Sequence, residues 1–113
     1  MSSFYVGNQG DFDYLVIKQL KLLKQQYTEI NIFIVLAYMP TPNTKLSPED
    51  LALSILPDNQ ENIHPKFAIN KRNQWMVEQA DYVITYVKYP MGGAAKFKNL
   101  AQRKGKTIIE LSE

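Results

Sequence analysis

The sequence predicts one α/β domain built around a parallel β-sheet. Three observations support this fold class. Short β-type runs alternate with stretches of helical periodicity along the whole chain. The run at residues 30–37 is almost entirely apolar and rich in Ile and Val, which is typical of a strand covered on both faces of a parallel sheet. The chain has 113 residues, of which 45% are hydrophobic and 21% charged, as expected for a single globular domain.

The first half of the chain predicts a strand, a helix, a second strand and a long loop. A β-type run at residues 4–6 stops at a turn of glycines and polar residues, 7–11. A helix follows, with Gly10 or Asp11 as its N-cap. Its apolar stripe consists of Phe12, Val16, Leu20, Leu23 and Tyr27. After the strand at 30–37, prolines punctuate residues 39–64, for which we expect a loop with one short helix around 48–56.

The acids of this loop are expected to be solvated. They are Glu49, Asp50, Asp58 and Glu61.

The second half predicts a helix, a strand, a glycine loop, a helix and a last strand. Pro65 suits the first position of a helix that continues through residues 67–79. Its core-facing residues are expected to be Ile69, Trp75, Met76 and Ala80. Residues 82–87 are β-branched and aromatic, as in a strand. The next helical stripe comprises Ala94, Phe97, Leu100 and Ala101. Gly105 is expected to cap this helix before a final strand at 107–111.

This order implies a minimal doubly wound, Rossmann-like sheet of about four parallel strands with helices on both faces. The simplest strand order is 2-1-3-4, joined by right-handed crossovers. Ligands of open α/β sheets bind beyond the carboxyl ends of the strands, where the strand order switches direction. The loops leaving strands one and three, residues 7–11 and 90–95, both contain glycines. The sequence therefore predicts that the two glycine loops converge on one ligand site.

The first loop combines groups that suit a nucleotide. Glycine lets the backbone approach a phosphate, and amides at a helix start attract anions. Carboxylates at the helix start would repel a phosphate, so we expect the two acids to face a ribose hydroxyl or a base edge instead. The predicted ligand-binding residues here are Gly7, Asn8, Gln9, Gly10, Asp11 and Asp13. The alternative is an ordinary tight turn in which Asp11 only caps the helix.

The second loop carries Gly92, Gly93 and Ala94, the other predicted ligand-binding residues of this kind. Small residues leave room for a ligand at the helix start, although close helix–sheet packing also requires them. Arg72 is the remaining predicted ligand-binding residue, because a guanidinium can hold phosphate with two hydrogen bonds. The alternative for Arg72 is a place on a solvated basic helix face.

Composition excludes several classes of site. The chain has no cysteine, which excludes a disulfide scaffold and a thiolate metal site. We assign no catalytic residue, metal or cofactor, and His64 is expected to lie in a loop or cap rather than to act in catalysis. A net charge of +2 does not support specific nucleic-acid binding. No signal peptide is visible and the longest apolar run is too short to span a bilayer, so we expect a cytoplasmic protein without membrane contacts.

The motifs resemble those of the SLOG superfamily, which groups DprA/Smf-like proteins with the LOG ("lonely guy") phosphoribohydrolases. The similarity is greatest to small Rossmann-fold nucleotide-binding proteins and covers nearly the whole chain, residues 1–113. The matching runs are FYVGNQGDFD (4–13), VLAYMP (35–40), KRNQWM (71–76), ADYV (80–83) and GGAA (92–95). This resemblance implies a single domain that binds a nucleotide or a nucleotide-derived ligand.

Two departures from that family pattern change the expectations. The chain starts at what resembles the family's second strand, so we expect it to lack the family's first β-α unit. We therefore expect the Phe4 strand to lie beside the Tyr82 strand. We also expect a second copy of the chain, in a homodimer, to cover the part of the sheet that the first β-α unit covers in the family. In LOG enzymes a glutamate follows the glycine loop, whereas residues 94–97 here contain no carboxylate. Binding without catalysis is thus favoured over a LOG-like hydrolase of nucleoside monophosphates, and a ligand-free remnant that acts through a protein partner is the third possibility.

Overall fold

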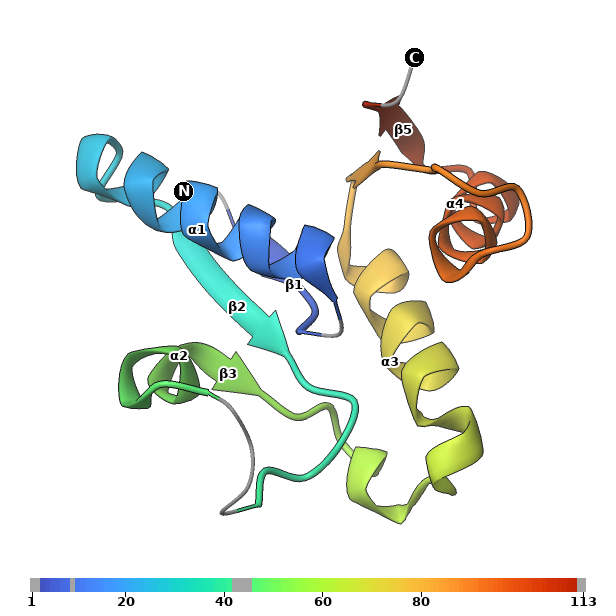
Figure 1. The fold of residues 1–113 in the computed structure, drawn as a ribbon, viewed down its shortest axis with the longest axis horizontal. Coiled ribbons are helices and arrows are strands. Elements are labelled where there is room, and N and C mark those ends of the chain that lie inside the picture. Colours follow the sequence, from blue (N-terminus) through green and yellow to red (C-terminus); the bar gives the residue numbers. More distant parts are fainter. Residues whose placement is uncertain (1–2, 9, 42–45, 112–113) are drawn as a thin grey trace. The chain divides into compact units, whose positions relative to one another are not determined.

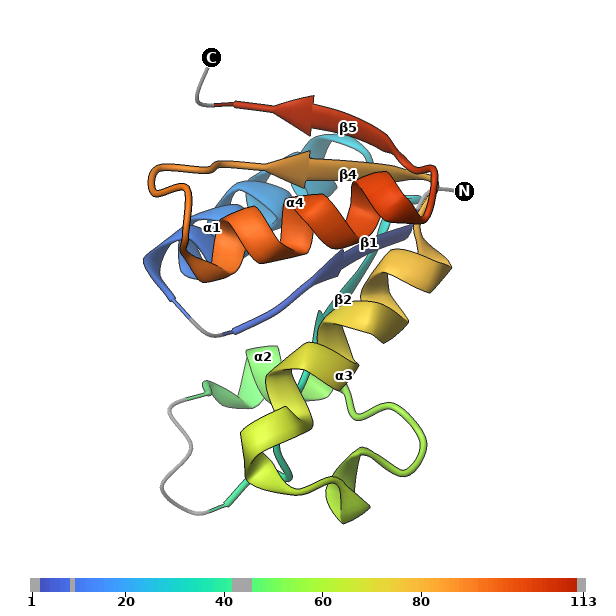
Figure 2. The ribbon, with the colours of Figure 1, turned by 90° about the vertical axis from the view of Figure 1, so that its right-hand side faces the viewer.

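The protein is an α/β chain of helices and parallel strands (Figures 1 and 2), described here from a computed structural model that covers residues 3–8, 10–41 and 46–111. In chain order the elements are β1 (Ser3–Val6), α1 (Asp11–Gln26), β2 (Asn31–Val35), α2 (Pro48–Leu53), β3 (Ser54–Ile55), the 3₁₀ helix η1 (Gln60–Asn62), α3 (Pro65–Gln79), β4 (Tyr82–Thr85), α4 (Gly93–Arg103) and β5 (Thr107–Glu110). They form two compact units, Met1–Arg72 and Asn73–Glu113, and each is described by itself.

The first unit is a parallel sheet in the order β1-β2-β3 with α1 packed against it. Strand β1 pairs with β2 so that Val6 lies opposite Ile34. Helix α1 buries Ile17 and Leu20 in the same cluster as these strand residues. The predicted period of α1 is therefore confirmed, but Leu23 and Tyr27 at its end are exposed and Ile17 is the inward residue instead.

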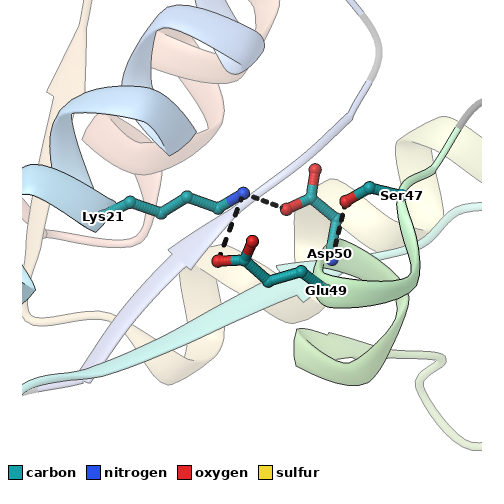
Figure 3. A network of polar contacts seen from close by, with 4 residues as sticks. All are labelled: Lys21, Ser47, Glu49 and Asp50. Carbon is teal, nitrogen blue, oxygen red and sulfur yellow. Dashed lines mark hydrogen bonds and ion pairs between the residues drawn. The ribbon is translucent and has the colours of Figure 1, made fainter.

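The segment expected to be mostly loop contains one more strand than predicted. Helix α2 confirms the expected short helix, and Ser47 caps it by accepting a hydrogen bond from the Asp50 amide at 3.1 Å. The missed strand is β3, which pairs in parallel with β2. Asp50 is half-buried and bonded to the ammonium group of Lys21 on α1, which also lies 3.9 Å from Glu49 (Figure 3). The expectation that Asp50 is solvated is therefore wrong.

Helix α3 begins at Pro65, as predicted. The imidazole of His64 accepts a hydrogen bond from the Lys66 amide at its Nδ1, at 3.1 Å, so His64 caps the helix. The predicted inward face of α3 is only partly right, because Ile69 is exposed. The prediction selected residues of this helix only because they are apolar, and it therefore missed the positions that the structure buries. These are Ala68, Arg72 and Val77.

The second unit is a two-stranded parallel sheet, β4-β5, covered on one face by α4 (Figure 2). Its core contains Val77, Val83 and Ala101, with Phe97 and Ile108 packed against them. Helix α4 ends in a Schellman motif: the amide of Lys106 donates to the carbonyl of Ala101 at 3.0 Å, and that of Gly105 to Gln102 at 3.1 Å. Gly105 has a φ of +71°, which confirms its predicted role as the helix cap.

The predicted strand order is not what the structure has. We expected four strands in one sheet in the order 2-1-3-4, whereas the described residues form five strands in two sheets. Two of the three strand pairs in that predicted order are present. The first strand pairs with the second, as β1 with β2, and the last two predicted strands pair as β4 with β5. The pairing of the Phe4 strand with the Tyr82 strand is not among the described pairs. Strand β3 was missed because two residues are too short to leave a periodic signal in a proline-rich segment.

Candidate functional site

Gly7, Asp13 and Arg72 meet at the carboxyl end of β1. A Cβ atom placed on Gly7 would lie 2.7 Å from Nη1 of Arg72 and 2.9 Å from Oδ2 of Asp13. Real Cβ atoms essentially never make contacts this short. The sequence needs glycine here because the guanidinium and the carboxylate occupy the space that any side chain would fill. Gly7, Asp13 and Arg72, three of the predicted ligand-binding residues, therefore lie side by side in the first unit.

Arg72 is buried, with 3% of its surface exposed. Its Nη1 donates a hydrogen bond to the carbonyl of Val35, at the end of β2, at 2.9 Å. Burial lowers the pKa of Arg72, and the nearby Asp13 and Tyr38 oppose this shift. The guanidinium remains charged at neutral pH because an arginine starts from a very high pKa. The alternative of a solvated basic helix face is thus wrong for Arg72, although its neighbour Lys71 is exposed.

The start of α1 has the predicted glycine N-cap but carries acids. Gly10 caps the helix in an extended conformation, and a Cβ added there would meet no described atom within 4 Å. Asp11 and Asp13 lie in the first turn, where their charge complements the helix dipole and disfavours a bound anion. The carbonyl of Asn8 accepts a hydrogen bond from the Tyr14 hydroxyl at 3.3 Å. Gln9 lies outside the described residues.

The start of α4 is open and contains no acid. Gly92 is the N-cap, and its amide donates to the carbonyl of Tyr89 at 3.2 Å. Gly93 and Ala94 follow in exposed positions, and a Cβ on Gly93 would meet no described atom within 4 Å. The amides of the first turn have no partner inside a helix, and a glycine cap offers them no side-chain oxygen. Lys96 adds an exposed positive charge in the same turn.

Glu110, which was not among the residues expected from the sequence to matter, organises the polar interior of the second unit. Its side chain is 6% exposed. One carboxylate oxygen accepts the Thr85 hydroxyl at 2.7 Å and lies 3.2 Å from Nζ of Lys98. The other accepts the Val87 amide at 2.8 Å, at the start of the loop that leads to α4. The sequence did contain a sign of this role, since Glu110 occupies an inward position of the last predicted strand. A charged side chain at such a position needs polar partners.

Gln60 is a second buried polar residue that the sequence pattern did not indicate. Its side-chain amide donates to the carbonyls of Ala37 at 3.0 Å and Ala68 at 2.6 Å. It therefore joins the segment after β2 to helix α3 within the first unit. It begins the short helix η1, and nothing in the local sequence marks it as buried, so only the fold makes this glutamine notable.

The predicted site residues belong to both units of the chain. Gly7, Asp13 and Arg72 belong to the first unit, and the glycines of the α4 start to the second. The convergence of both loops on one ligand stays a prediction. No group of three or more His, Cys, Asp or Glu in the described ranges is arranged to hold a metal ion. None of the helices in the described part of the chain is long and apolar enough to cross a membrane.

Comparisons with known proteins identify no family for this chain. No family description matches the sequence, and no curated protein matches it. The resemblance to the SLOG superfamily therefore depends on the order of its motifs alone and stays a prediction.

Proposed function

We propose that this chain binds a nucleotide or a nucleotide-derived ligand, whose phosphate is held by the backbone amides that begin α4. The observation that carries the proposal is the glycine N-cap of α4, followed by an open first turn without a carboxylate. Such a helix start presents several N–H groups and the positive end of the helix dipole to an anion. Lys96 strengthens the attraction, whereas Lys98 is held by Glu110.

The start of α1 is less suited to a phosphate than the start of α4. Gly10 is equally open, but Asp11 and Asp13 bring negative charge into the first turn. A carboxylate accepts hydrogen bonds from hydroxyl groups and repels phosphate, so Asp11 suits a hydroxyl-bearing group such as a ribose better than a phosphate. Asp13 is less suited to this role because it lies beside the Arg72 guanidinium.

Calorimetric titration with AMP, ADP and ADP-ribose tests the proposal, with adenosine as the ligand that lacks phosphate. We expect the phosphate-bearing compounds to bind and adenosine to bind much more weakly. Binding of none of the three phosphate compounds would overturn the proposal. Equal affinity for adenosine and AMP would do the same, because the phosphate would then contribute nothing.

A pair of matched variants locates the phosphate. In Gly92→Asp the new carboxylate caps α4 and occupies the anion position, so we expect a loss of affinity for AMP of at least about tenfold. The added Cβ has only ordinary contacts, at 3.6 Å and beyond. An aspartate N-cap also stabilises a helix, so unfolding cannot explain the loss. The control is Asn99→Asp, which adds the same charge at an exposed position about two turns further along α4 and should alter phosphate affinity by less than about threefold.

A further inference from the structure

The second unit has an apolar sheet face that α4 does not cover. Along β4 and β5 the side chains alternate, and Val83 and Ile108 pack with Phe97 of α4. The opposite face carries Tyr82, Ile84, Ile109 and Leu111, which we name the outer sheet face. These four side chains are 68%, 51%, 48% and 53% exposed, respectively. Large apolar side chains therefore occupy the side of the sheet that a solvated strand would fill with polar residues.

The centre of this face is formed by two isoleucines from neighbouring strands. Ile84 and Ile109 lie directly opposite each other in the parallel register. Leu111 continues the alternation past β5, and its amide donates to the carbonyl of Thr85 at 2.8 Å, so the two chains stay paired there. Thr107, opposite Tyr82, is the other outward residue and has no charge. The outer sheet face is thus continuous across the two strands and uncharged.

We propose that the outer sheet face packs against the same face of a second copy of this chain. Helix α4 covers only one side of this two-stranded sheet, and burial of the apolar side chains on the other side would be favourable. Its exposed area is on the order of 500 Å², the upper range of patches on monomers, which often mark interaction sites. Two copies would bury about 1,000 Å², which reaches the lower bound of a specific interface. A two-fold pairing brings no like charges together because the four side chains are uncharged.

The oligomeric state as a function of protein concentration is the first test. Sedimentation equilibrium should show a reversible dimer in the unmodified chain. In Ile84→Lys each copy would bury an unpaired lysine charge in the dimer interface. We therefore expect the dissociation constant of the dimer to rise at least about 100-fold. The control is Met91→Lys, which places the same charge on an exposed loop residue and should leave dimerisation unchanged. A chain that stays monomeric at every concentration would overturn the proposal, whether this face is covered within the chain or by another protein.

Single cysteines provide a second test that does not depend on a destabilising charge. The chain contains no cysteine, so any disulfide-linked dimer reports the introduced residue alone. We expect Ile84→Cys or Ile109→Cys to form such a dimer under mild oxidation, and Met91→Cys to form much less. If neither central variant forms it in excess of Met91→Cys, the pairing of these faces is refuted. This test also decides the matter if Ile84→Lys fails to fold.

Discussion

Replacing Gly7 by alanine is expected to destabilise the protein by about 1–2 kcal/mol. The backbone at Gly7 does not have a positive φ, so an alanine is not strained there by its backbone. The added methyl group would lie 2.7 Å from Nη1 of Arg72 and 2.9 Å from Oδ2 of Asp13. Both groups must move by several tenths of an ångström to reach an ordinary contact distance. Because Arg72 is buried, its guanidinium has little space into which it can move.

The magnitude follows from what that movement disturbs. Arg72 donates to the carbonyl of Val35 at 2.9 Å, and a hydrogen bond from a charged group contributes about 1.5–3 kcal/mol. Part of this contribution is lost when the guanidinium shifts. Alanine also restricts the unfolded chain, which offsets about 0.4–1 kcal/mol. The net effect corresponds to a melting temperature lower by about 5–10 °C for a domain of this size.

Urea unfolding followed by circular dichroism measures this change. Gly10→Ala is the matched control, because it lies in the same loop and its methyl group would meet no described atom within 4 Å. We expect that control to stay within about 0.5 kcal/mol of the unmodified chain, since a weaker N-cap and a stiffer unfolded chain nearly cancel. In an Arg72→Met background the effect of Gly7→Ala should be smaller. The reasoning is refuted if Gly7→Ala matches its control, or if its effect is the same in both backgrounds.

Three further substitutions test the polar contacts and the helix end. Gly105→Ala should lower the free energy of unfolding by about 1–2 kcal/mol in thermal unfolding, because φ is +71° there; an unchanged melting temperature would contradict this. Gln60→Leu leaves two buried carbonyl oxygens without their donor and should lower the urea stability by about 2–3 kcal/mol, whereas a neutral effect would mean that the bonds at 3.0 and 2.6 Å contribute nothing. Thr85→Val removes the 2.7 Å bond to Glu110 while keeping the shape, with an expected loss of about 1–2 kcal/mol; a rise in the urea midpoint would argue against it.

Most of the helices and strands are determined by residues that lie close together in the sequence. The apolar period of α1, the apolar run of β2 and the proline at the start of α3 each act within a few residues of one another. The helix cap at Gly105 is a further example, because the amides of Gly105 and Lys106 reach only to the carbonyls of Gln102 and Ala101. Helix periods, caps and turns follow from local backbone geometry, so the sequence alone predicts them.

Contacts between distant residues were decided only by the tertiary structure. Arg72 is buried because it reaches the carbonyl of Val35, 37 residues away in the sequence. Glu110 gains its role from Thr85, 25 residues away, and the two residues of β3 form a strand only because β2 is beside them. The same is true of the arrangement of five strands in two sheets in the described part of the chain. A buried polar group or a short strand is stabilised by partners that the local pattern does not contain, and folding alone brings those partners together.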